Sequence, residues 1–241
     1  MGFQFIILAA GKGTRMNSAL PKVLVGFRGK PIIQHLLDSL NDIQTEHKPI
    51  IVVGHKYDLV QSYLGNSYIY AFQEGQLGTA HAVAAAKDKV TADNVIVLYG
   101  DMPFIKNESL LKLMSNHVLQ KNTFTMFTSK VPSFDHKYQV FQSFGHILRN
   151  NGEVAQIKEF LVCNEQERQI TEVNPGIYAF KTSWLWNNIN KVKMNKQKEY
   201  YLTDMVEIAI KNGQRIQTLP IEPNEVYGIN TLTQLEQAPE I

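Results

Sequence analysis

Hydrophobic residues in the first half of the chain alternate between short continuous apolar runs and segments where they recur every three or four positions. Continuous runs are typical of buried strands in a parallel sheet, and the three-to-four spacing is typical of amphipathic helices. The pattern predicts strands over 5–10, 50–53, 68–72 and 94–99, and helices over 31–40, 59–64, 79–87 and 108–119. This alternation predicts right-handed crossovers and a mixed, mostly parallel sheet with helices on both faces, an α/β fold.

The second half of the chain has a different pattern. Short strand-like segments occur at 138–144, 146–149, 154–158 and 176–180, and Asn150-Asn151-Gly152 is a hairpin signal. Helical patterns return at 184–189 and 203–211. We expect Asp204 and Glu207 to form a capping box at the start of the last of these helices, and Gly213 to end it. The sequence therefore predicts a smaller antiparallel region within one domain, 1–241, divided into halves of about 1–130 and 131–241.

Composition and charge narrow the classes of protein that fit. Hydrophobic residues make up 44% and charged residues 19% of the chain, as in globular proteins, and the net charge is only +2. This balance gives no reason to expect a nucleic-acid or membrane partner. The single cysteine, Cys163, excludes an internal disulfide, and the N-terminal apolar run is too short for a membrane span and lacks a preceding basic segment. We expect a cytoplasmic protein.

The stretch Leu8-Ala-Ala-Gly-Lys-Gly-Thr-Arg-Met16 carries the strongest chemical signal. It follows the first predicted strand, and glycines at 11 and 13 allow a phosphate to approach main-chain N–H groups. It matches neither the Walker A loop nor the Rossmann fingerprint. Arg15 on the same loop and Lys22 shortly after it add two cations, which predicts a triphosphate site, with solvated surface residues as the alternative.

A second signal follows the strand predicted at 94–99. Gly100 permits a sharp bend and Asp101 places a carboxylate at the carboxyl end of that strand, where ligands bind in open α/β sheets. A hard oxygen ligand at this position suits Mg²⁺. The alternative is that Asp101 only forms a turn before Met102-Pro103. The first interpretation predicts that Asp101 faces the glycine loop.

These motifs together resemble the sugar-1-phosphate nucleotidyltransferases, and in particular the uridylyltransferase (pyrophosphorylase) domain of bifunctional N-acetylglucosamine-1-phosphate uridylyltransferases. The resemblance covers nearly the whole chain in order. It is carried by the first glycine loop with Pro21-Lys22 and by blocks at 53–55, 76–83, 98–103, 176–178 and 199–204. It implies the nucleotide-diphospho-sugar transferase fold, with a nucleotide-binding first half and a sugar-binding second half. It also implies Mg²⁺ as cofactor.

The resemblance implies a role for each matching position. Arg15, Lys22 and Asp101 would be catalytic, and Asp101 with Asn230 would hold Mg²⁺. The remaining roles are nucleotide binding by Leu8, Ala9, Ala10, Gly11, Gly13, Thr14, Gln73, Gln76, Gly78 and Thr79, and sugar binding by Tyr99, Gly100, Gly145, Glu159, Asn174 and Thr203. Without the resemblance, Gln73 and Gln76 are polar loop residues and Asn230 is a cap for the last helix.

Three departures from the family pattern lie in the second half. Tyr-Gly-Arg appears as Phe144-Gly145-His146, the charged residues after Glu159 become apolar, and Asn-Thr-Gly becomes Asn174-Pro175-Gly176. The nucleotide end is thus better supported than the sugar end. The acetyltransferase β-helix of the bifunctional proteins has no counterpart in the sequence, so we expect a free-standing transferase.

The expected reaction is an in-line attack of N-acetylglucosamine 1-phosphate, or a similar sugar 1-phosphate, on the α-phosphorus of UTP, giving a UDP-sugar and pyrophosphate. One alternative is a related transferase that uses dTTP or CTP with another sugar or alcohol phosphate. Another is a non-catalytic nucleotide-sugar sensor, although retention of Arg15, Lys22 and Asp101 argues against it. The partners are small molecules, and the oligomeric state stays open.

Overall fold

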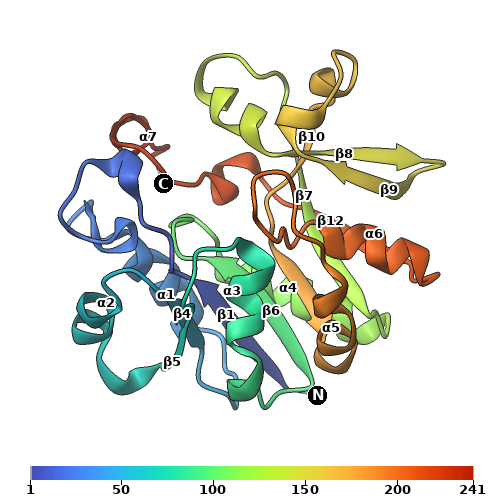
Figure 1. The fold of residues 1–241 in the computed structure, drawn as a ribbon. Helices are drawn as coiled ribbons and strands as arrows, with labels where there is room; N and C mark the ends of the chain where they lie inside the picture. The colour runs from blue at the N-terminus through green and yellow to red at the C-terminus, as the bar shows by residue number, and fades with distance from the viewer. Residues whose placement is uncertain (1, 241) are drawn as a thin grey trace.

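Within residues 2–240, which a computed structural model describes, ten strands form one sheet (Figure 1). Their spatial order is β5-β4-β1-β6-β11-β7-β10-β8-β9, and β12 pairs with β7. The bounds are β1 Phe3–Leu8, β4 Ile50–Val53, β5 Ile69–Phe72, β6 Asn94–Tyr99, β7 Phe124–Lys130, β8 Gly145–Asn150, β9 Glu153–Lys158, β10 Glu172–Asn174, β11 Tyr178–Lys181 and β12 Ile216–Pro220; β2 Gly26–Phe27 and β3 Lys30–Pro31 form a separate hairpin.

The central strands are mostly parallel. β5, β4, β1 and β6 pair in parallel, and so do β7 and β12. β11 is antiparallel to both of its neighbours, β6 and β7, and therefore joins two blocks that point the same way. The strands β10, β8 and β9 extend the sheet with antiparallel pairs. The predicted mixed, mostly parallel sheet with a smaller antiparallel region is confirmed.

Helices cover both faces of the sheet, because alternate residues of the buried strands point to opposite sides. Phe5 and Ile7 of β1 belong to the core that contains Leu36 of α1, whereas Ile6 and Leu8 belong to the core that contains Val83 of α3. The first core also takes buried residues from α2 and α4, and the second from α5 and α6. The helix bounds are α1 Ile32–Asn41, α2 Tyr57–Leu64, α3 Thr79–Ala85, α4 Asn107–Leu119, α5 Thr182–Asn188, α6 Asp204–Lys211 and α7 Leu232–Glu236. In the described part of the chain, no helix has both the length and the apolar character needed to cross a bilayer.

The predicted elements of the first half agree with the structure to within a few residues, and β6 has the predicted bounds. The strand predicted at 138–144 is wrong, because His136–Ser143 forms a 3₁₀ helix. Tyr138, Phe141 and Phe144 recur every three positions, the period of that helix, and their rings pack in sequence on one another. β7, β10 and β12 were not predicted.

Three local features were predicted in the second half: a hairpin turn, a helix end and a capping box. The first two are correct and the third is not. Asn151 and Gly152 both have positive φ (50° and 83°), as a type I′ turn between β8 and β9 requires. Gly213 ends α6 with φ 68°, and the N–H groups of residues 213 and 214 bond the carbonyls of 210 and 209 in a Schellman motif. The capping box is wrong: no side chain caps the start of α6, and the hydroxyl of Thr203 donates instead to Glu159 Oε1.

The buried imidazole of His117 makes stability depend on pH. His117 of α4 is 1% exposed and its Nδ1 is hydrogen-bonded to Thr125 Oγ1, while Nε2 has no partner within residues 2–240. Burial lowers its pKa from 6.5 to about 4. The neutral form is therefore the one that the folded state favours. Neutral His117 makes its full contribution to the free energy of unfolding above pH 6.5, the pKa of the imidazole in the unfolded chain. This contribution is lost as the pH falls towards 4, the pKa in the folded protein.

We expect the free energy of unfolding to fall as the pH is lowered from 6.5 to 4, with a contribution from His117 on the order of 3 kcal/mol over the whole window. Urea unfolding of wild-type protein and of His117→Gln, measured at several pH values, separates this contribution from that of the carboxylates. The wild-type curve should be steeper below pH 6.5. Parallel curves would show that His117 does not cause the dependence.

Candidate active site

A cavity of about 480 Å³ opens at the carboxyl ends of β1 and β6. One wall comes from the first half of the chain, from the end of β1, the turn after β6 and the start of α3. The opposite wall comes from the ends of β8, β9 and β10 and from Thr203 before α6. The cavity therefore lies where an open α/β sheet binds ligands, between the two halves that the sequence analysis distinguished.

Most of the predicted site residues line this one cavity. They are Leu8, Ala9, Ala10, Gly11, Lys22, Gln73, Gln76, Gly78, Thr79, Tyr99, Asp101, Gly145, Glu159, Asn174, Thr203 and Asn230. Positions separated by more than 200 residues in the sequence thus share one space. The roles assigned to them individually stay predictions.

Four predicted residues, Gly13, Thr14, Arg15 and Gly100, do not line the cavity. Gly13 has φ 63°, and a Cβ there would lie 2.5 Å from Lys22 Cβ, so this glycine allows Lys22 to pack beneath the loop. Gly100 lies behind the wall against the Leu8 carbonyl. Thr14 begins an exposed 3₁₀ turn. Arg15 is exposed at the rim, with Nη2 3.5 Å from Asn230 Oδ1.

A charged cluster occupies the base of the cavity. Lys22 Nζ donates to Asp101 Oδ2 at 2.5 Å and to Asn230 Oδ1 at 2.7 Å. The side chains of Lys22 and Asp101 are only 15% and 12% exposed. A charge that is this far buried needs a partner, and each of these two charged side chains provides one for the other. The prediction that Asp101 faces the glycine loop region agrees with this geometry.

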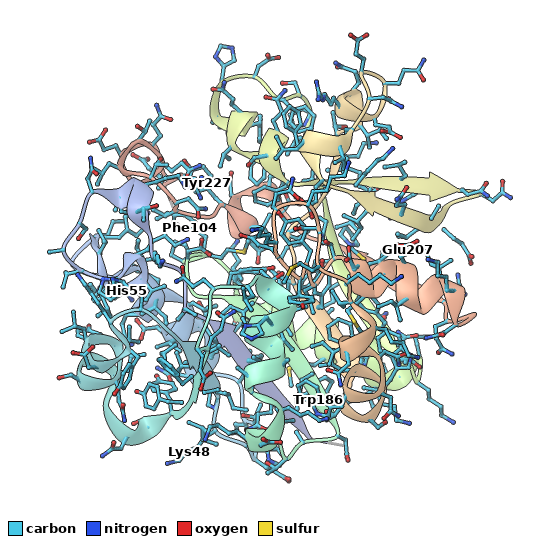
Figure 2. All side chains as sticks on the ribbon, viewed as in Figure 1. Lys48, His55, Phe104, Trp186, Glu207 and Tyr227 are labelled. Atoms are coloured by element: carbon cyan, nitrogen blue, oxygen red, sulfur yellow. The ribbon has the colours of Figure 1, made fainter. Side chains whose placement is uncertain are left out.

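The C-terminal segment is held against the loop after β6, and this brings Asn230 to Asp101. The Ile229 N–H donates to the Asp101 carbonyl at 2.9 Å. Phe104 and Tyr227, labelled in Figure 2, pack edge to face with ring centroids 6.2 Å apart. Asn230 does not cap the last helix, because Thr231 Oγ1 accepts the N–H of Gln234 there. The capping alternative for Asn230 is therefore wrong.

The donor set of Asp101 and Asn230 fits Mg²⁺. Both present an oxygen to the same cationic group, here the Lys22 ammonium. Mg²⁺ in nucleotide sites takes one or two protein oxygens and completes its shell with phosphate and water. Gly228 leaves room beside them, since a Cβ there would lie 3.3 Å from Asn230 Nδ2. Among residues 2–240, no group of three or more His, Cys, Asp or Glu side chains forms another candidate metal site.

The loop that carries Gln73 and Gln76 is fixed at both ends. The Gln76 side-chain amide donates to the Ala10 carbonyl at 2.5 Å, and the buried Gln73 amide donates to the Gly78 carbonyl at 3.1 Å. Thr79 Oγ1 accepts the N–H of Leu202 at 2.9 Å. These contacts join the loop to the end of β1 and to the segment before α6, although Gln76 itself is exposed, so the alternative of polar loop residues stays open for it.

On the opposite wall, Glu159 and Thr203 meet through the 3.1 Å hydrogen bond from the Thr203 hydroxyl. Burial and the neighbouring Asp204 raise the pKa of the Glu159 carboxyl, against the lowering effect of that hydrogen bond. Asn174 uses its side chain within the wall: Oδ1 accepts the Gly176 N–H at 3.0 Å and Nδ2 donates to the Tyr178 hydroxyl at 2.6 Å. Asn174 therefore shapes the wall.

The residues that depart from the family pattern fall into two groups. Phe144 and Pro175 line the cavity. His146 points elsewhere: it is fully buried, Nδ1 donates to the Ile170 carbonyl, and its ring packs near Phe134 and Phe160. His146 is therefore not among the residues that line the cavity, and this departure does not change the cavity surface directly.

The sequence analysis did not identify several of the residues that line the cavity. They are Val23, Ala82, Met102, Ser143, Gly176, Glu199 and Gly228. Glu199 adds a second carboxylate to the acceptor wall, and its place in the recognised block at 199–204 was the available signal. Gly176 has φ 78°, and a Cβ there would lie 2.6 Å from the Tyr99 ring. A tertiary contact of this kind leaves no local pattern.

Gly78 is expected to be essential for the shape of the nucleotide-side loop. Its φ of 100° is a conformation that L-residues rarely adopt, and a Cβ would lie 2.5 Å from the Tyr200 carbonyl oxygen. Gly78→Ala should lower the free energy of unfolding by about 1–3 kcal/mol and weaken the binding of nucleotide. Chemical denaturation and calorimetry measure the two effects. Gly75→Ala is the matched control, because its nearest contact would be 3.4 Å; equal behaviour of the two variants would contradict the interpretation.

Comparison with known proteins places this site in a family. The chain is 40% identical over 240 residues to the bifunctional protein GlmU of Brevibacillus brevis. The aligned region covers 97% of this chain and 50% of that protein, so the chain spans about half the length of this relative. The fold matches a protein from Bacillus anthracis provisionally described as a glucose-1-phosphate thymidylyltransferase (TM-score 0.75, 21% identity, 98% and 93% of the two chains). It also matches the inositol-1-phosphate CTP transferase of T. maritima (TM-score 0.72, 17% identity, 98% and 94%). Residues 5–158 match the MobA-like NTP transferase domain, and the chain therefore belongs to this family of nucleotidyltransferases.

Proposed function

We propose that this chain transfers the uridylyl group of UTP to N-acetylglucosamine 1-phosphate, or to a similar sugar 1-phosphate, with Mg²⁺ as cofactor. The observation that carries the proposal is the convergence of the glycine loop, Lys22, Asp101 and Asn230 on one cavity. The similarity to GlmU over nearly the whole chain supports the choice of nucleotide and sugar. The products are a UDP-sugar and pyrophosphate.

The nucleotide end supplies charge and position. The backbone at Ala10–Gly11 and the exposed Arg15 are the groups proposed to hold the β- and γ-phosphates, and Lys22 is placed to reach the α-phosphate. Bound Mg²⁺ would neutralise phosphate charge as the pyrophosphate departs. Gln73 and Gln76 are proposed to face the base, where amide groups can match the donor and acceptor edge of uracil.

The reaction needs no protein base. A sugar 1-phosphate is ionised near neutral pH, so one of its oxygens can attack the α-phosphorus of UTP directly. That new P–O bond forms as the bond between the α-phosphorus and the bridging oxygen breaks, and pyrophosphate leaves with the electron pair. The protein contributes orientation of the two substrates and stabilisation of charge on the transferring group.

The acceptor end is proposed to recognise the sugar through Glu159, Thr203 and the backbone at Gly145. The carboxyl of Glu159 is held in place by the Thr203 hydroxyl and can accept a sugar hydroxyl. Tyr99 packs against Gly176, and both residues line the cavity. The departures at Phe144 and Pro175 lie in the same wall, so they bear on which acceptor fits.

A second candidate is a related transferase that uses dTTP or CTP with another sugar or alcohol phosphate. Two observations support this second candidate. The fold matches proteins described as a thymidylyltransferase and a CTP transferase, and Phe144 and Pro175 change the wall proposed to bind the acceptor. A non-catalytic sensor fits less well, because binding a nucleotide sugar does not require Lys22, Asp101 and Asn230 to converge on one point.

Pyrophosphate release measured with each of UTP, dTTP, CTP, ATP and GTP against a panel of sugar and alcohol phosphates tests the proposal. UTP with N-acetylglucosamine 1-phosphate should give the highest kcat/KM. Higher turnover with dTTP or CTP would select the second candidate. No release with any pair of substrates would refute a transferase activity for this chain.

Removing a charge from the cluster should abolish turnover without unfolding the protein. Asp101→Asn and Lys22→Ala are each expected to lower kcat by at least about 10²-fold, since Lys22 is proposed to contact the reacting phosphates and Asp101 is proposed to hold the metal ion that neutralises them. Asp93→Asn is a matched control, because Asp93 is exposed just before the opposite end of β6. Circular dichroism and thermal unfolding check the fold. Near-normal turnover in Asp101→Asn or Lys22→Ala would remove that residue from the proposed chemistry.

A further inference from the structure

The ammonium of Lys22 lies between the two residues proposed to hold the metal. It donates to Asp101 Oδ2 and Asn230 Oδ1 at 2.5 and 2.7 Å. A Mg²⁺ ion bound to the same oxygens would lie about 2.1 Å from each. The ion and the ammonium would then be at most about 5 Å apart, between side chains that are only 15% and 12% exposed. Their mutual repulsion disfavours both cations being bound at once.

The lysine has a structural reason to be there. The Asp101 side chain is 12% exposed, and a carboxylate so buried is costly without a counter-ion. Arg15 is the other cation near the cluster, but it is exposed and approaches Asn230 at 3.5 Å. Lys22 therefore provides the opposite charge that the Asp101 carboxylate needs in this position.

The base of the Lys22 side chain is fixed while its end can move. Gly13 packs against Lys22 at Cβ, where any larger residue would collide at 2.5 Å. The torsions beyond Cβ remain available to swing the ammonium from Asp101 towards a phosphate on the loop above. A triphosphate bound at Gly11–Gly13 would supply both a new partner for this ammonium and additional oxygen ligands for the metal.

We propose that Lys22 is an internal counter-ion that closes the metal position until nucleotide arrives. The metal then enters with the triphosphate, whose oxygens draw the ammonium away from Asp101 and Asn230. Metal binding and nucleotide binding are thereby coupled through one side chain. This inference rests on the proposed role of Asp101 and Asn230 as metal ligands, and it assigns Lys22 a second role besides its contact with phosphate.

The test is Mn²⁺ binding to protein without nucleotide, followed through the electron paramagnetic resonance signal of free Mn²⁺. Wild-type protein should bind weakly at this site. Lys22→Met removes the charge and keeps most of the volume, and it should bind Mn²⁺ at least about tenfold more tightly. Lys22→Gln should behave in the same way, which covers the case in which the methionine variant does not fold. Adding Asp101→Asn to either variant should abolish the gain.

Lys211→Met is the matched control, because Lys211 also pairs with a carboxylate, that of Glu207 on the same helix, but outside the cavity. It should leave Mn²⁺ affinity unchanged. Equal affinity in wild type and both Lys22 variants would overturn the proposal. So would tight binding to nucleotide-free wild-type protein that Asp101→Asn alone removes. Mn²⁺ binding is measured without turnover. A failure of the proposed function would appear as absent pyrophosphate release, so it is distinguishable from a failure of this inference.

Discussion

The contact of Lys22 with Asp101 and Asn230 is the interaction on which the site depends. It joins positions 79 and 208 residues apart and places a buried charge pair where three segments of the chain meet. Each segment is fixed by something other than charge: Gly13 admits the Lys22 stem, the order of β1 and β6 brings Asp101 beside it, and the Ile229 backbone bond brings Asn230. The packed framework therefore holds together groups that would be unstable apart.

The nucleotide half of the fold could be predicted because its information is local. β1, β4 and β6 are continuous apolar runs, and each helix between them shows its own buried face. β7 could not be found in this way, since it buries Thr125, Thr128 and Ser129 at the centre of the sheet. Those hydroxyls are satisfied at a distance, Ser129 by the carbonyl of Ile221, 92 residues away. Only the tertiary structure makes such a strand compatible with burial.

The same distinction applies to the site. Gly11, Asp101 and Gly78 follow or precede regular elements and could be placed from the sequence with the family resemblance. Gly228 could not, because its relevance comes from the surface that it faces. Thr203 shows how local rules fail at such positions. A threonine before a helix is normally its cap, but here its hydroxyl donates to Glu159 in the same wall of the cavity.

The two walls of the cavity are built differently, and under the proposed function this would separate the chemistry of nucleotidyl transfer from the choice of acceptor. The phosphate side rests on the parallel core, where a change at Gly13 or Gly228 would disturb the charged cluster itself. The acceptor side is made of short antiparallel strands and 3₁₀ turns, and Phe144 and Pro175 reach the cavity from them without contacting Lys22 or Asp101 through any hydrogen bond. Substitutions there can alter the fit of a sugar while the charge arrangement persists. The family pattern is accordingly kept around Lys22 and Asp101 and changed around Phe144 and Pro175, which is the division expected if one phosphoryl-transfer site is adapted to different acceptors.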